Sequence, residues 1–230
     1  FVKKLTRTMI EEGMFRGVLS KVNQIERGWY GDEDYVGDGI KIGTRLGRKL
    51  QVRGESRDTK WSRLDSGRID KRLVAELGFG NDRVFQTTFT ESYSDAILHI
   101  SVDASGSMSG KKWTKTMTSV VAITKACSMI QNVDVVVSFR STDDGGNYST
   151  RRADTKPLII IAYDSRVDNF NKVRRDFPHI HPGGTTPEGL CFEAIMDDFV
   201  PSTTDRDSYF LNFSDGMPMF SNNDMYYTSE

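Results

Sequence analysis

The sequence lacks long apolar runs, and it also lacks an excess of one charge. Apolar runs such as Pro157–Tyr163 are far shorter than the roughly 20 residues that a helix needs to cross a bilayer. The formal net charge over 230 residues is −1, which gives no overall attraction for nucleic acid. With 37% hydrophobic residues, the chain suits one or two globular domains with a buried core. We therefore expect a protein without a membrane anchor.

Cysteine is scarce as well. The chain contains only Cys127 and Cys191, and two cysteines in a chain of this length do not make a disulfide framework. The chain begins at Phe1 and shows no signal-peptide pattern. These features favour a reducing environment, and we expect a cytoplasmic protein.

Basic residues are concentrated in one part of the chain. Between Lys41 and Arg72, eleven Lys or Arg stand against four acidic residues, and a Gly- and Asp-rich stretch at 28–39 precedes them. This change of composition predicts a mostly helical amino-terminal region over residues 1–94, followed by a second domain over residues 95–230. Within the first region we expect a helix at Val2–Arg27, a helix at about Ile42–Val52, a short strand near Trp61–Leu64 and a helix from about Ser66.

From Ala96 onward, apolar strands alternate with amphipathic helices, which is typical of a mainly parallel sheet covered on both faces. The residues between the second and third strands are polar and show no helical pattern, so we expect these strands to form an antiparallel pair at the sheet edge. The fold class predicted is α/β, with a doubly wound, mainly parallel sheet and one antiparallel edge strand. The expected strands are Ala96–Asp103, Val133–Phe139, Leu158–Tyr163 and Ser208–Phe213, and the expected helices are Lys111–Gln131, Arg166–Asp176 and Pro187–Phe199.

The stretch Ile97–Trp113, "ILHISVDASGSMSGKKW", runs an apolar strand into a carboxylate and several hydroxyls. A phosphate-binding loop needs four residues between its glycines, whereas Gly106 and Gly110 are separated by three. A serine nucleophile elbow needs Gly-x-Ser-x-Gly, and the central position after Gly106 is Met108. Both of these sites are therefore excluded at this loop.

A metal site remains. Asp103, Ser105 and Ser107 supply oxygen ligands at alternate positions, and oxygen ligands favour Mg²⁺, with Mn²⁺ or Ca²⁺ as alternatives. Alone, this pattern is common at helix caps. Two later loops support the metal site, because the carboxyl ends of neighbouring strands in a doubly wound sheet meet in one crevice. These loops are "HPGGTTPEGL", with Thr185 and Thr186, and "LNFSDGMP", with Asp215.

With these motifs the sequence resembles the von Willebrand factor A domain, whose metal-ion-dependent adhesion site has Asp-x-Ser-x-Ser, a loop threonine and a strand-end (S/T)DG. The resemblance covers about Ala96–Asp215. It favours Thr185 over Thr186, because the threonine of the family directly follows the "GG" position. The family continues with further helix and strand units after the "DG" loop, whereas this sequence ends at Glu230, so the resemblance implies either that the chain is cut or that another polypeptide supplies the remaining sheet edge. The metal ligands that it implies are Asp103, Ser105, Ser107, Thr185 and Asp215.

The stretch Thr44–Leu77, "TRLGRKLQVRGESRDTKWSRLDSGRIDKRLVAEL", is similar to the cobaltochelatase CobT group. That group has an arginine-rich helix, a Trp-containing strand and "x-x-G-x-(I/L)-D" before its metal-site domain, and Trp61, Gly67, Ile69 and Asp70 stand in these places. The resemblance implies a non-ATPase subunit that works with a ring-forming AAA+ ATPase of the MoxR/CobS type. The metal would then be a docking point for an Asp or Glu of that partner.

Two other functions remain as alternatives. A Mg²⁺-assisted phosphohydrolase would use the same oxygens with His181 as base, although His179 and His181 without a further nitrogen or sulfur ligand are more often packing residues. An extracellular adhesin of the same fold would need a signal sequence. The hydroxyl-rich ligand set favours docking over catalysis, so we expect a non-catalytic subunit.

Overall fold

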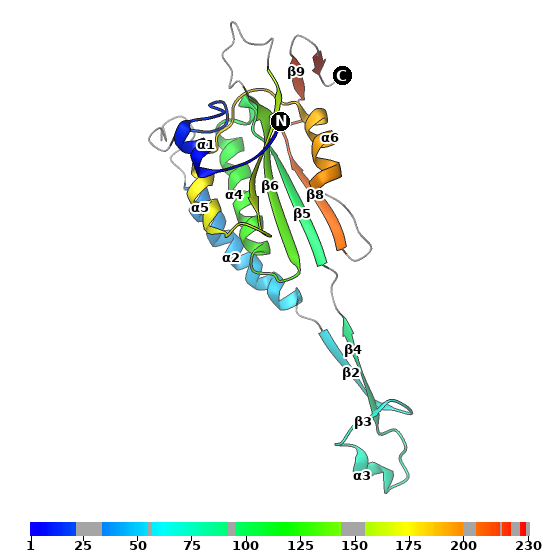
Figure 1. The fold of residues 1–230 in the computed structure, drawn as a ribbon. Helices are drawn as coiled ribbons and strands as arrows, with labels where there is room; N and C mark the ends of the chain where they lie inside the picture. The colour runs from blue at the N-terminus through cyan, green and yellow to red at the C-terminus, as the bar shows by residue number, and fades with distance from the viewer. Residues whose placement is uncertain are drawn as a thin grey trace.

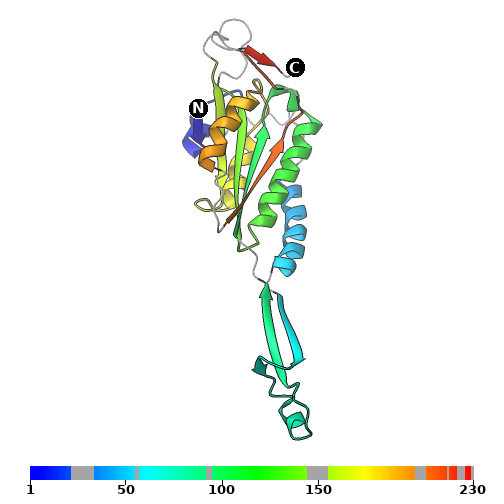
Figure 2. The ribbon, with the colours of Figure 1, turned by 90° about the vertical axis from the view of Figure 1, so that its right-hand side faces the viewer.

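The computed structural model describes residues 1–21, 34–54, 57–91, 95–143, 155–199, 206–216, 218–221 and 226–228. A five-stranded, mainly parallel sheet lies at the centre of the molecule, with helices on both of its faces (Figure 1, Figure 2). A three-stranded antiparallel sheet projects from one end of this body as an arm. The fold class is therefore α/β. No helix within the described residues is both long and apolar enough to span a membrane.

The central strands are nearly continuous apolar runs because both of their faces are covered. β5 pairs in parallel with β6 on one side and with β8 on the other, whereas β6 and β7 are antiparallel. All four strands that we predicted are present, with ends within three residues of the expected ones. They are β5 (Asp95–Asp103), β6 (Val133–Thr142), β7 (Pro157–Asp164) and β8 (Arg206–Phe213).

The reversed strand β7 is not at the edge of the sheet, and this part of the prediction was wrong. The strand β1 (Val2–Lys4) pairs in parallel with β7, with Val2 opposite Ile159, so the sheet order is β1-β7-β6-β5-β8. The backbone of Phe1 continues the pairing, since its carbonyl accepts a hydrogen bond from the Ile159 amide at 2.8 Å. The amino-terminal segment thereby satisfies the backbone groups that an edge strand would leave open.

The helix expected at Val2–Arg27 is also wrong. After β1, the helix α1 spans only Arg7–Glu12, and residues 22–33 lie outside the described residues. Thr6 caps the start of α1 with its side chain, and Gly13 ends it in the left-handed conformation at φ 68°. Local capping therefore outweighs the helical spacing of the apolar residues.

Two long helices form a layer on one face of the sheet. The helix α2 (Tyr35–Gly54) extends well beyond the expected 42–52 and lies along α4 (Lys111–Cys127) (Figure 1). The contact is close at Gly43, where an added Cβ would lie 2.4 Å from the Ala122 carbonyl oxygen. β1 and α2 therefore belong to the layers of the central body, although both precede the domain boundary that we expected after residue 94.

The other face of the sheet carries α6 (Glu188–Phe199), which starts one residue after the expected position. The helix expected at Arg166–Asp176 is shorter, since α5 spans Asn171–Asp176 and a 3₁₀ turn, η3, follows at Phe177–His179. Asp164 and Asp168 explain the later start, because their carboxylates accept backbone N–H groups and form turns there.

The arm consists of the segments between α2 and β5. The strand expected near Trp61–Leu64 is present and longer, but the helix expected from Ser66 is wrong, because a turn with Gly67 at φ 124° leads into a short strand. A small hairpin follows β8 near the carboxyl end of the chain. The elements of the arm are β2 (Arg57–Leu64), β3 (Arg68–Ile69), α3 (Val74–Leu77) and β4 (Phe85–Glu91), and those of the hairpin are β9 (Met219–Ser221) and β10 (Tyr226–Thr228).

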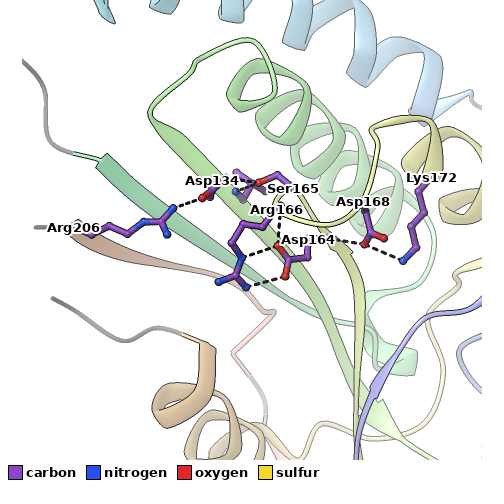
Figure 3. Close-up of polar contacts among 8 residues, drawn as sticks. Asp134, Asp164, Ser165, Arg166, Asp168, Lys172 and Arg206 are labelled. Atoms are coloured by element: carbon purple, nitrogen blue, oxygen red, sulfur yellow. Dashed lines mark hydrogen bonds and ion pairs between the residues drawn. The ribbon is translucent and has the colours of Figure 1, made fainter.

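A network of charged side chains lies at the end of the sheet where β6 and β8 begin (Figure 3). Asp134 of β6 forms an ion pair with Arg206 of β8 and accepts a hydrogen bond from the Ser165 hydroxyl at 3.0 Å. Asp164 forms an ion pair with Arg166 at 2.8 Å. Acidic side chains pair with basic ones in this network, so their charges compensate each other and the ion pairs connect the ends of the strands.

Candidate metal site

The candidate site is centred on Asp103, the last residue of β5. Its side chain is completely buried, and the backbone N–H of Ser105 donates a hydrogen bond to Oδ1 at 2.8 Å. The chain turns sharply after the strand, and this turn holds the carboxylate in place.

Two other loops reach the same carboxylate. The Thr186 hydroxyl, on the loop before α6, lies 3.3 Å from Asp103 Oδ2, and the Ser214 hydroxyl, after β8, lies 3.4 Å from the same oxygen. Two segments that lie about 80 and 110 residues after Asp103 in the sequence therefore contact its side chain. This agrees with the expected crevice at the carboxyl ends of parallel strands.

The two serines of the first loop lie next to each other. Ser105 is buried, Ser107 is exposed, and their hydroxyl oxygens are 2.9 Å apart. Ser107 sits in the short 3₁₀ turn η1 (Gly106–Met108), which brings its hydroxyl back over the strand end. The loop thus presents one carboxylate and two hydroxyls together.

Backbone hydrogen bonds connect the first loop to the threonine loop, and the threonine loop to β9. The amide of Gly183 donates to the Ala104 carbonyl at 2.7 Å, and the amide of Gly106 donates to the Gly184 carbonyl at 3.2 Å. Thr186 exchanges two backbone hydrogen bonds with Met219, each 3.1 Å long. Gly184 has φ 75°, and a Cβ there would lie 2.4 Å from the Thr142 hydroxyl oxygen, so only glycine fits this turn.

The two threonines have different surroundings. Thr186 bonds to Asp103, whereas the Thr185 hydroxyl oxygen is buried and has no hydrogen-bond partner among the described residues. The backbone N–H of Thr185 donates to the Thr142 hydroxyl at 3.2 Å, which fixes the position of the residue. A buried oxygen without a donor is unfavourable unless a water or a cation reaches it, and in this respect Thr185 fits a metal ligand.

Asp215 follows β8, and its side chain is largely buried. The Lys112 ammonium lies 3.4 Å from Asp215 Oδ2 and donates to the Ser107 carbonyl at 3.4 Å. Lys112 is the second residue of α4, and its side chain remains 61% exposed. It therefore connects the first and third loops over the outer side of the site.

Electrostatics at Asp103 favour a cation. Burial raises the pKa of the Asp103 carboxyl, and the negative charge of Asp215 raises it further, while hydrogen bonds from Ser105 and the charge of Arg140 act in the opposite direction. A divalent cation would offset both unfavourable effects. The donor set of two carboxylates and three hydroxyls matches hard cations such as Mg²⁺.

A cluster of charged and polar side chains packs next to the site. Arg140 of β6 is fully buried, and its guanidinium donates to the Ser101 hydroxyl at 2.7 Å and to Glu188 at 3.0 Å. Asn212 of β8 donates to the same Glu188 oxygen at 2.9 Å. These bonds hold the first turn of α6 against the strand ends, directly after the threonine loop.

The sequence places Thr186 on the same loop but favours Thr185 as the ligand, whereas Ser214, Lys112 and Arg140 are not among the predicted site residues. Ser214 directly precedes Asp215 in the "SDG" motif. Lys112 and Arg140 nevertheless have a signal in the sequence: Lys112 follows the glycine-containing loop, and Arg140 is the one basic residue in the largely apolar strand "VDVVVSFR".

The two histidines contact the amino-terminal segment. The His181 amide donates to the Val18 carbonyl at 2.9 Å, and its ring Nδ1 lies 3.4 Å from the Pro182 carbonyl oxygen. Burial lowers the pKa of His181, so its ring is neutral at pH 7. The His179 carbonyl accepts a hydrogen bond from the Ser20 amide at 2.8 Å. These contacts agree with packing roles.

The three loops bring together oxygen donors of the kind that hard divalent cations prefer. Among the described residues there is no group of three or more His, Cys, Asp or Glu side chains placed to bind a metal, and the candidate site does not need one because hydroxyls supply most of its oxygens. The chain matches no protein-family model, no curated protein and no solved structure.

Proposed function

We propose that this chain is a metal-dependent docking subunit. The ligands proposed for Mg²⁺ are Asp103, Ser105, Ser107, Thr185 and Asp215. The observation that supports this best is the convergence of three loops on the buried carboxylate of Asp103. Neutral hydroxyls cancel little of the charge of a dication, so the site favours an incoming carboxylate from a partner.

The proposed partner is an AAA+ ATPase of the MoxR/CobS type, which contributes an Asp or Glu to the metal. This part rests on the similarity of Thr44–Leu77 to the CobT group. In this proposal the chain is a non-catalytic, cytoplasmic subunit of a chelatase or remodelling complex, and ATP-driven motion in the partner makes or breaks the contact.

The test is whether an AAA+ ATPase of the MoxR/CobS type co-purifies with this chain. We expect binding in Mg²⁺, loss of binding in EDTA, and loss with Asp103→Ala. Ser109→Ala is the matched control, because Ser109 lies on the same turn and its exposed hydroxyl donates to the Gly106 carbonyl at 2.7 Å. It should bind as the wild type does.

Undiminished binding of Asp103→Ala, or binding that persists in EDTA, would contradict the proposal. A phosphoester hydrolysis assay covers the enzymatic alternative: turnover that requires Mg²⁺ and disappears in Asp103→Asn would replace docking by catalysis.

A further inference from the structure

Lys112 places a positive charge at the outer side of the candidate metal site. Its ammonium lies 3.4 Å from Asp215 Oδ2 and donates to the Ser107 carbonyl at 3.4 Å. The Asp215 side chain is only 8% exposed, so water reaches this carboxylate poorly. The ammonium therefore already contacts a carboxylate that is a proposed ligand of the metal.

The position of Lys112 within α4 is unfavourable for the helix. Lys112 is the second residue of α4, where the positive end of the helix dipole disfavours a cation. The first turn contains no acidic residue that would offset this charge, and Gly110 at the N-cap offers no side-chain hydrogen bond. The contact with Asp215 offsets the unfavourable position of the charge, so the lysine belongs electrostatically to the site and not to the helix.

The carboxylates of the site need a counter-charge when no metal is bound. The charge of Asp215 raises the pKa of Asp103, which means that the two carboxylates repel each other. Arg140 also acts on Asp103, but its guanidinium is already paired with Glu188 at 3.0 Å. Lys112 forms its ion pair directly with one of the two proposed carboxylate ligands. Its charge therefore reduces the repulsion that a metal would otherwise have to remove.

We propose that Lys112 is a built-in counter-ion of the metal-free site, which gives way to the metal at Asp215 and thereby sets the affinity for Mg²⁺. This inference rests on the proposed metal site. Lys112 is suited to leave Asp215, because its side chain is 61% exposed and a lysine carries its charge on a flexible stem of four carbons. Metal binding is then an exchange of one cation for another at the same carboxylate.

Both states of this exchange lower the affinity for Mg²⁺. In the metal-free chain, Lys112 stabilises the negative charge of Asp215. In the metal-bound chain, its ammonium remains close to the site and repels the dication. A single and a double positive charge about 5 Å apart in water repel each other by an amount that corresponds to roughly tenfold in a dissociation constant, and salt reduces this effect. Removal of the charge should therefore strengthen the binding of Mg²⁺.

Isothermal titration of Mg²⁺ into the full chain tests the inference. Lys112→Met removes the charge and keeps the apolar stem, and its dissociation constant for Mg²⁺ should fall by roughly three- to tenfold. Lys112→Arg keeps the charge and should bind as weakly as the wild type. Lys111→Met is the matched control, because Lys111 precedes Lys112 in the same helical turn, is exposed and forms no ion pair with any other described residue. It should leave the affinity nearly unchanged.

Ionic strength gives a second readout. An increase of KCl from about 0.1 M to about 1 M shortens the Debye length from about 10 Å to about 3 Å, so the difference between Lys112→Met and the wild type should shrink. A difference that came from an altered loop structure would not depend on salt in this way. Circular dichroism of each variant verifies that it is folded.

Equal or weaker Mg²⁺ binding by Lys112→Met would overturn the role of Lys112, and so would an equal gain in Lys111→Met. Either result leaves the metal site in place as long as the wild type binds Mg²⁺. Absence of Mg²⁺ binding by all four proteins would instead contradict the metal site and this inference together. Tighter Mg²⁺ binding by Lys112→Met without any Mg²⁺-dependent partner would support the inference and contradict only the docking function.

Discussion

At the scale of single residues, Thr185 and Thr186 are neighbours in sequence whose hydroxyls differ in their partners. The Thr186 hydroxyl bonds to a buried carboxylate, and the Thr185 hydroxyl is buried without a partner among the described residues. We therefore expect substitution of Thr186 to lower mainly the stability of the fold, and substitution of Thr185 to lower mainly the affinity for the metal.

Thr186→Val should lower the free energy of unfolding by about 1–3 kcal/mol, because it removes a hydrogen bond to a charged, buried acceptor. Thr185→Val should leave the unfolding free energy without Mg²⁺ nearly unchanged, yet weaken Mg²⁺ binding. Urea denaturation with and without Mg²⁺ measures both effects. Thr186→Ser is the control that restores the hydroxyl, and equal stability losses at both positions would contradict the assignment.

The residue types of the site were predictable from the sequence, but their contacts were not. Asp103, Ser105 and Asp215 follow strands whose apolar character is plain, so the topology alone brings them together. The turn at Gly184 decides whether the hydroxyl of Thr185 or that of Thr186 faces the Asp103 carboxylate. A shift of one residue in this turn would exchange the two hydroxyls. Arg140 was not predicted because its partners, Ser101 and Glu188, come from two other elements, β5 and α6.

At the scale of elements, the contact between α2 and α4 depends on glycine. Gly43 faces the Ala122 carbonyl, and an added methyl would overlap it at 2.4 Å. Gly43→Ala should therefore destabilise the protein by about 1–2 kcal/mol, since overpacking outweighs the gain in helix propensity.

Gly189→Ala is the matched control in α6, because nothing lies within 4 Å of its added Cβ. This substitution should stabilise the protein by about 0.5 kcal/mol through helix propensity alone. Thermal and urea unfolding of the two variants provide the comparison, and opposite signs are expected. A stabilising Gly43→Ala would show that the helices are farther apart than described.

Asp176 joins α5 to α1. Its completely buried side chain forms ion pairs with Arg175 at 2.8 Å and with Arg7 at 3.3 Å. Burial alone would raise the pKa of Asp176, but the two arginines outweigh it and hold the pKa below its ordinary value. The charged form thus stabilises the fold above the unfolded pKa of about 3.9, and this contribution is lost as the pH falls through the folded pKa.

Asp176→Asn should cost about 1–3 kcal/mol at pH 7, and the difference from wild type should shrink below about pH 4. Urea denaturation over this pH range measures it. Asp38→Asn removes an exposed ion pair with Lys41 and should have no measurable effect. A cost of Asp176→Asn that is independent of pH would point to packing instead of charge.

The elements that were predicted correctly have a pattern of apolar residues that is visible within the element itself. The four central strands are apolar runs that remain recognisable without knowledge of their neighbours. The first residues of the chain form a strand only because β7 offers a partner edge more than 150 residues away. Such long-range pairing leaves no local pattern in three residues.

At the scale of the whole molecule, two separate surfaces lie at opposite ends of β5. The candidate metal site follows Asp103, and the arm precedes Asp95. At about 3.3 Å per residue, the nine residues of this strand separate the two ends by roughly 30 Å. A substitution in the arm therefore lies far from the candidate metal site.

The measurement that tests the central claim most directly is isothermal titration of Mg²⁺ into the full chain. We predict one Mg²⁺ per chain for the wild type and for Ser109→Ala, and no binding for Asp103→Ala, whose fold is verified by circular dichroism. The absence of Mg²⁺ binding by the wild type, or equal binding by Asp103→Ala, would contradict the assignment of this site.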